Sequence, residues 1–178
     1  MSTKYVGVFC SASDLPENYT EPAKKFASLL VENGFNLVWG GSDTGLMKVM
    51  AGGVKEAGGK IVGVSMEILK HAARADADEM IIAPNLSERK ALMLTKSDAI
   101  AVLPGGIGTL DEMTEMLELK KHGLHSKMIV MLNTEGFYDG LKMQLERMKQ
   151  EGFIAKELND LISFADTPEE AIHFLKNS

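Results

Sequence analysis

Short apolar runs rich in β-branched residues alternate with helical patterns along the chain, and this alternation limits the folds open to it. Several runs are apolar almost throughout, which is typical of parallel strands covered on both faces. The predicted strands are Tyr5–Cys10, Leu37–Trp39, Ile61–Val64, Met80–Ile82, Ala99–Leu103, Met128–Leu132 and Leu161–Phe164. Strands and helices that alternate at these lengths form right-handed βαβ units. The pattern therefore predicts an α/β fold of three layers around a mostly parallel sheet.

Helical spacing of apolar residues is found in the segments between these strands. Helices are expected from Thr20 to Val31, from Arg89 to Lys96 and from Thr109 to Lys121. Near the C-terminus, Thr167-Pro168-Glu169-Glu170 combines an N-cap, a proline at the first helical position and a capping-box glutamate. One more helix is predicted by Phe137, Leu141, Leu145 and Met148.

Length and composition indicate one ordinary globular domain. The chain has 178 residues, of which 45% are hydrophobic and 25% charged, and folded domains cluster at about 100–200 residues. With 25 acidic and 19 basic residues, the net charge is −6, which disfavours binding to a phosphate polymer. We expect a single domain over residues 1–178 that does not bind nucleic-acid polymers.

Cysteine content and hydropathy exclude several classes of protein. Cys10 is the single cysteine, and no Cys/His cluster has the spacing of a zinc site. No apolar run reaches the length of about 18 residues that a membrane span needs. The N-terminal residues lack the apolar region and cleavage site of a signal peptide. We expect a soluble, cytoplasmic protein with no metal site and no membrane partner.

The glycines are concentrated locally. Of the 17 glycines, eight lie between Gly40 and Gly63, and three more are Gly105, Gly106 and Gly108. Locally enriched glycine indicates backbone that turns tightly or approaches another group closely. In open α/β sheets, ligands bind at the loops that follow the carboxyl ends of the strands. Both glycine-rich segments begin at such positions.

The second glycine segment has two open interpretations. Three glycines in four positions, followed by a helix, allow backbone N–H groups to converge on a phosphate, with Thr109 adding a hydroxyl donor. The segment could equally be a tight turn with Thr109 as the helix N-cap. It is not a P-loop, because no Gly-Lys-Ser/Thr follows. Asp111 stands where the dinucleotide fingerprint has its last glycine, which disfavours an NAD(P) dehydrogenase.

Two further loops are expected to face the same ligand. Gly40, Gly41 and Gly45 follow the second predicted strand, and Ser13 follows the first. Gly58-Gly59 is interpreted as a helix C-cap without a functional role.

Three charged residues are candidates for chemistry. Glu112 is either the capping-box partner of Thr109 or a carboxylate beside the glycine loop, held ionised by the helix dipole. Arg89 and Lys90 start a predicted helix, where such a pair usually lies on the surface. Positive charge there is unfavourable to the helix, which suggests a partner such as an anionic ligand or Glu112. Glu115 is expected to be solvated.

These residues together resemble a known family. The run Pro104-Gly105-Gly106-Ile107-Gly108-Thr109-Leu110-Asp111-Glu112, with Arg89-Lys90 upstream, looks like the LOG family of cytokinin riboside 5′-monophosphate phosphoribohydrolases, formerly labelled lysine decarboxylases. The resemblance covers nearly the whole chain. It also includes Gly40-Gly41 with Gly45, and Leu132-Asn133 through Tyr138.

The resemblance implies a homodimeric Rossmann-like protein that splits a nucleoside 5′-monophosphate into free base and ribose 5-phosphate, without a cofactor. Arg89 and Glu112 would be catalytic. Substrate would be bound by Lys90 and by the loop residues Gly105, Gly106, Ile107, Gly108 and Thr109. The sequence differs from the family pattern at Ser11, Ser42, Lys48, Leu86-Ser87 and Glu118–Lys121.

The departures leave the identity of the base open. They also leave open an alternative, a non-catalytic binder of a phosphorylated ligand similar to the molybdenum-cofactor carriers. A decarboxylase would need a Schiff-base lysine, for which the sequence offers no candidate.

Overall fold

Seven parallel strands form one sheet in the computed structural model, which describes residues 4–177. The strands are β1 (Lys4–Phe9), β2 (Phe35–Trp39), β3 (Ile61–Met66), β4 (Glu79–Ala83), β5 (Ala99–Val102), β6 (Ile129–Leu132) and β7 (Ser163–Ala165). All six strand pairings are parallel. The α/β class and the mostly parallel sheet predicted from the sequence are thus confirmed.

The strand order places a natural binding crevice at the centre of the sheet. The order is β4-β3-β2-β1-β5-β6-β7. The chain therefore builds outward from β1 to β4 and then crosses back to β5 on the other side of β1. At such a switch point the loops after the two central strands diverge, and ligands bind between them. Here those loops follow β1 and β5.

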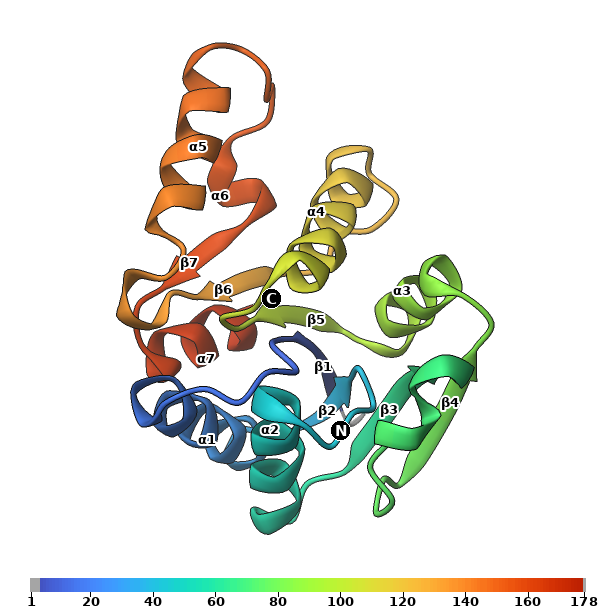
Figure 1. The fold of residues 1–178 in the computed structure, drawn as a ribbon. Coiled ribbons are helices and arrows are strands. Elements are labelled where there is room, and N and C mark those ends of the chain that lie inside the picture. The colour runs from blue at the N-terminus through green and yellow to red at the C-terminus, as the bar shows by residue number, and fades with distance from the viewer. Residues whose placement is uncertain (1–3, 178) are drawn as a thin grey trace.

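Helices cover both faces of the sheet, which gives the predicted three layers (Figure 1). One face carries α1 (Glu17–Glu32), α2 (Gly45–Glu56) and α7 (Pro168–Lys176). The other carries α3 (Leu86–Lys96), α4 (Ile107–Lys121), α5 (Asp139–Gln150) and the short α6 (Leu158–Leu161). Two 3₁₀ helices complete the described elements, η1 (Glu67–Ala72) and η2 (Thr134–Gly136).

The apolar strands build two separate cores because successive side chains point to opposite faces of the sheet. Val6, Val8 and Cys10 pack with Phe26 and Leu30 of α1 in one core. On the other face, Phe9 belongs to the core that contains Met93 of α3, Met113 and Met116 of α4, and Tyr138. Both helical layers are therefore attached to the sheet by apolar burial.

Several predicted boundaries were wrong, including the start of α1, which is Glu17 rather than Thr20. Helix α3 begins at Leu86 rather than Arg89, because the Asn85 side chain caps it by accepting from the Glu88 amide. Helix α4 begins at Ile107, with Gly106 at the N-cap position. Thr109 is therefore not the cap. The segment predicted as a strand from Leu161 instead ends α6 with Leu161 and begins β7 at Ser163.

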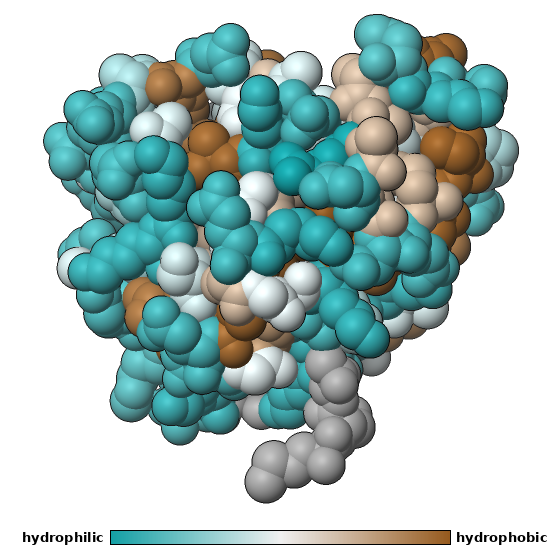
Figure 2. Space-filling view, turned by 90° about the horizontal axis from the view of Figure 1, so that it is seen from below, coloured by the Kyte–Doolittle hydropathy of each residue, from teal (hydrophilic) through white to brown (hydrophobic). Residues whose placement is uncertain are grey.

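The C-terminal helix matches its sequence signal. Thr167 accepts from the Glu170 amide, and Pro168 is the first residue of α7. None of the helices within residues 4–177 is long and apolar enough to cross a membrane. Hydrophilic side chains cover most of the face that Figure 2 shows.

Candidate functional site

Three loops meet above the carboxyl ends of β1, β2 and β5. The Ser11 amide donates to the Pro104 carbonyl at 3.1 Å, which joins the loop after β1 to the loop after β5. The Ser11 carbonyl accepts from the Met47 amide at 3.3 Å, which joins the first loop to the start of α2. The three ligand-facing loops predicted from the sequence are thus neighbours.

Arg89 reaches this region from α3 and is buried, with 6% of its surface exposed. Its Nε donates to the Val64 carbonyl at 2.8 Å, and its Nη2 donates to the Gly40 carbonyl at 3.3 Å. Its Nη1 donates to Glu112 Oε1 at 2.6 Å. The surface position favoured from the sequence was wrong, and of the two partners suggested there, an anionic ligand or Glu112, the structure shows Glu112.

The absence of a side chain at Gly40 leaves room for the Arg89 guanidinium. A Cβ at Gly40 would overlap Arg89 Nη2. Because the next residue along the chain, Gly41, has φ +80°, the loop turns away from the strand immediately after this contact. Gly40 is therefore part of the site through Arg89.

Glu112 is buried between α4 and α3 and does not form a capping box. Its Oε1 accepts from Arg89, and Thr109 is inside the helix rather than at its cap. The structure gives Oε2 no hydrogen bond. Among residues 4–177 no buried side-chain oxygen lacks a partner, so Oε2 is the oxygen that solvent reaches.

The pKa of Glu112 is raised, contrary to the expectation from the helix dipole. Burial is the largest cause because it disfavours the charged carboxylate. The Arg89 guanidinium opposes this shift by Coulombic attraction and by its hydrogen bond. A buried carboxyl group whose pKa is perturbed by burial and by a specific charged partner is a candidate functional group.

The glycine loop after β5 leaves space at the start of α4. A Cβ at Gly106 or Gly108 would meet no atom within 4 Å, and Ile107 between them is 83% exposed. Gly105 differs, because a Cβ there would overlap the buried Thr109 side chain. The loop therefore bends over Thr109 and turns its other two glycines toward open space.

A cavity of about 260 Å³ lies against this loop on the side of β1. It is lined by Gly105 and Gly106 of this loop and by Ser11 and Ser13 of the loop after β1. The Tyr19 and Phe137 rings also line it, edge to face with centroids 6.1 Å apart. Three of the predicted binding residues, Ser13, Gly105 and Gly106, are thus brought to one cavity.

A family model described as "possible lysine decarboxylase" matches residues 47–175. The chain belongs to this family, the LOG family. A cytokinin riboside 5′-monophosphate phosphoribohydrolase of Mycobacterium tuberculosis is 34% identical over 169 residues, covering 94% of this chain and 90% of the relative. One from Arabidopsis thaliana is 35% identical over 176 residues, covering 97% and 77%.

Solved structures share the LOG-family fold. The molybdenum cofactor binding protein of Rippkaea orientalis superimposes with a TM-score of 0.77 at 22% identity, covering 99% of this chain and 98% of that one. A molybdenum cofactor carrier protein of Chlamydomonas reinhardtii gives a TM-score of 0.75 at 23% identity, covering 99% and 97%. At these identities the likeness concerns the fold alone.

Lys90, the second residue of the LOG-family Arg-Lys pair, is engaged with carboxylates. Its Nζ lies 2.9 Å from Asp111 Oδ2 and also pairs with Glu115 Oε2. These bonds raise the pKa of the Lys90 ammonium, Glu115 being the largest cause. Glu115, expected to be solvated, is half-buried and ion-paired.

Gly41 and Gly45, also predicted to bind substrate, pack against other residues of the protein. A Cβ at Gly45 would overlap the backbone of Ala12 and Ser13, and its φ is +55°. A Cβ at Gly41 would lie about 3.0 Å from the Ser65 side chain. The two glycines bring the loop after β2 close to its neighbours.

Two residues that sequence reasoning did not single out support the glycine loop. The Tyr138 hydroxyl donates to the Leu103 carbonyl at 2.7 Å and has a backbone hydrogen bond from Gly105. The Asn133 Oδ1 accepts from the Tyr138 amide at 2.7 Å. Both residues belong to the Leu132–Tyr138 stretch of the family resemblance, which was the only sequence signal for them.

Within residues 4–177, no group of three or more His, Cys, Asp or Glu side chains could hold a metal ion. Cys10 is buried beside the site, and burial raises the pKa of its thiol. The thiol is therefore protonated and unsuited to act as a nucleophile, as its interpretation as a small buried hydrophobe predicted.

Proposed function

We propose that this LOG-family protein hydrolyses the N-glycosidic bond of a nucleoside 5′-monophosphate, either AMP or an N6-substituted AMP such as a cytokinin riboside 5′-monophosphate. The products are the free base and ribose 5-phosphate. The observation that carries the proposal is the buried Arg89–Glu112 pair, joined at 2.6 Å beside an open glycine loop. The printed names of the relatives at 31–35% identity support it.

Phosphate binding at the start of α4 would orient the nucleotide. The backbone N–H groups of Gly106, Ile107 and Gly108 are at the helix N-terminus, where about half a positive charge is available to an anion. The open space at Gly106 and Gly108 lets a phosphate approach the backbone. Binding energy from this remote group then holds the sugar in a reactive position.

The chemical step needs a carboxylate at the sugar. When the bond between C1′ and the base nitrogen breaks, its electron pair leaves with the base and positive charge builds on the ribose ring. Glu112 Oε2 stabilises that charge and accepts a proton from the attacking water, whose oxygen bonds to C1′. The base takes up one proton from solvent water as it leaves, and Glu112 later returns the proton that it accepted to the solvent, so that the net reaction consumes one water molecule. Arg89 holds Oε1 and so orients the free oxygen.

The pH dependence follows from the raised pKa of Glu112. The mechanism requires the ionised carboxylate, so activity falls as pH decreases through that pKa. Since burial raises it above the ordinary value of 4.5, the acid limb of kcat/KM should lie above pH 4.5. An acid limb at or below that value would contradict the role of Glu112 as the titrating base.

The direct test is to incubate the protein with AMP and with N6-substituted AMPs and to measure free base. Glu112→Gln should lower kcat by about 10²–10⁴-fold, and Arg89→Ala should also abolish most turnover. Glu118→Gln is the matched control, because Glu118 is an exposed glutamate on the same helix that pairs with Lys121. Tight nucleotide binding by the wild type without any base release would instead support the non-catalytic carrier.

The proposal includes a cytoplasmic homodimer, which the family resemblance supports. The chain has a mass of 19.4 kDa. Light scattering should therefore give twice this mass, and a monomeric mass would contradict the dimer.

A further inference from the structure

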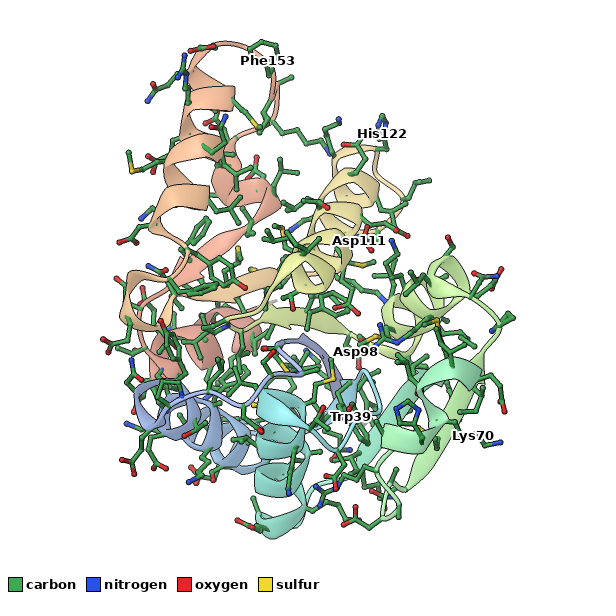
Figure 3. The ribbon with its side chains drawn as sticks, viewed as in Figure 1. Trp39, Lys70, Asp98, Asp111, His122 and Phe153 are labelled. Carbon is green, nitrogen blue, oxygen red and sulfur yellow. The ribbon has the colours of Figure 1, made fainter. Side chains whose placement is uncertain are left out.

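The ammonium of Lys90 is enclosed by acidic groups. Only 9% of its side chain is exposed, although lysine is among the residues that are rarely buried. Its Nζ contacts Asp111 Oδ2 and Glu115 Oε2, both on α4. Asp111 lies on the side of α4 that faces α3 (Figure 3). A phosphate at Nζ would lie beside the negative charge of these two carboxylates.

Two consecutive residues of α3 thus bridge to the first turns of α4. Arg89 binds Glu112, and Lys90 binds the residues on either side of it along the helix, Asp111 and Glu115. The start of α4 carries both Glu112 and the glycine loop. The second bridge therefore sets where the carboxylate and the loop stand relative to Arg89.

The charges around Glu112 depend on the same bridge. From α3 it faces Arg89 and Lys90, from its own helix Asp111, and from the loop after β1 the protonated thiol of Cys10. Asp111 repels the Glu112 carboxylate, and Lys90 attracts it. Without Lys90, the negative charge of Asp111 and Glu115 would be uncompensated beside the pair, and these carboxylates would compete for the Arg89 guanidinium.

We propose that Lys90 is a positioning residue, which holds Asp111 and Glu115 so that α4 presents Glu112 to Arg89, and that it does not contact the substrate phosphate. This role differs from the direct substrate contact that the family resemblance implies for the position. It rests on the proposed hydrolysis for its kinetic consequences, but not for its claim about phosphate binding.

The first experiment measures kcat, KM and the pH profile for AMP with Lys90→Met. A misplaced Glu112 should lower kcat by about 10²-fold, leave KM within about threefold of the wild type, and move the acid limb to higher pH. The triple variant Lys90→Met/Asp111→Asn/Glu115→Gln removes the whole charge cluster and should return the acid limb toward lower pH. A tenfold or greater rise in KM with kcat retained would overturn the proposal.

A second variant, which changes the two partners of Lys90 instead of Lys90 itself, tests the proposal if Lys90→Met does not fold. Asp111→Asn/Glu115→Gln leaves Lys90 in place but frees its ammonium. Positioning predicts a lower kcat at unchanged KM and an acid limb at lower pH, opposite to the shift in Lys90→Met. If the freed Lys90 instead leaves kcat at the wild-type level, the bridge does not position Glu112.

A binding measurement separates failure of this proposal from failure of the proposed function. Calorimetry with ribose 5-phosphate needs no turnover, so it is informative even if the wild type releases no base. Lys90→Met should bind within about threefold of the wild type, as should Lys121→Met, a matched control on the exposed side of α4 that pairs with Glu118. Binding weakened tenfold or more in Lys90→Met alone would show that Lys90 is a phosphate ligand.

Discussion

The two glycine loops follow parallel strands in the same sheet, yet their glycines serve different purposes. In the loop after β2, Gly40 and Gly45 are in contact with the protein itself, with Arg89 and with the Ala12–Ser13 backbone. In the loop after β5, Gly106 and Gly108 have no atom within 4 Å of a substituted Cβ. In the first loop, other protein groups occupy the space beside the glycines, and in the second loop the space beside Gly106 and Gly108 is open.

The difference shows how one residue type can build a site in two ways. A glycine in the first loop allows protein groups to pack closely, and so brings Arg89 toward Glu112. A glycine in the second loop leaves backbone amides accessible to a ligand. Substitutions in the first loop should therefore affect folding, and substitutions in the second should affect binding.

The largest effect is expected for Gly45→Ala. The new Cβ would overlap the backbone of Ala12 and Ser13, which cannot move as a side chain can, at a φ of +55°. We expect the free energy of unfolding in urea to fall by about 3–5 kcal/mol. Gly58→Ala is the control, since Gly58 has φ +84° with nothing within 4 Å, and should cost only about 1–2 kcal/mol. Equal losses in both would show that packing at Gly45 is unimportant.

A smaller effect is expected for Gly40→Ala. Its Cβ would displace Arg89 Nη2, the end of a flexible side chain, so the protein can adjust. The displaced guanidinium loses its bond to the Gly40 carbonyl and its alignment with Glu112. We expect about 2 kcal/mol of lost stability together with slower base release. Wild-type kcat in this variant would separate Gly40 from the catalytic pair.

Tyr138→Phe tests the support beneath the second loop. The phenol bridges the Leu103 carbonyl and the Gly105 amide in the interior, so its removal leaves buried polar groups without a partner. A loss of about 1–2 kcal/mol in urea unfolding is expected. Because the loop also loses its alignment, KM for AMP should rise. An unchanged KM would mean that the loop holds its shape without this hydroxyl.

The smallest change in stability, of opposite sign, is expected for Gly108→Ala. Gly108 lies in the first turn of α4 with open space around it, and alanine favours a helix over glycine by up to about 1 kcal/mol. The protein should therefore be as stable as the wild type or slightly more so. Ribose 5-phosphate should nevertheless bind more weakly, because the added methyl occupies the approach to the amides. Unimpaired binding would place the phosphate elsewhere.

The strands could be predicted because their signal is local. An apolar run such as Ala99–Leu103 is buried on both faces, and that requirement is visible in the run itself. The first residues of helices were harder to predict, because several neighbouring residues can serve as the N-cap. Thr109 has the residue type of an N-cap, but it is buried inside α4 under Gly105, and the cap is at Gly106.

The site was predicted only in part. Arg89 and Glu112 were identified through the resemblance, and their contact was one of the open alternatives. The sign of the Glu112 pKa shift was wrong because the sequence shows the helix dipole but not the burial, and burial is the larger cause. The ion pairs of Lys90 with Asp111 and Glu115 could not be predicted from the sequence, since they depend on how α3 packs against α4.

The sequence by itself determined the α/β class, the parallel sheet, and the presence of glycine-rich loops at the carboxyl ends of its strands. It could do so because periodicity and glycine content depend on near neighbours in the chain. Only the tertiary structure decided which glycines are packed and which are open, and which carboxylate each cation of α3 binds. Those outcomes depend on groups far apart in sequence, such as Arg89 and Gly40, that the crossover from β4 through α3 to β5 brings together.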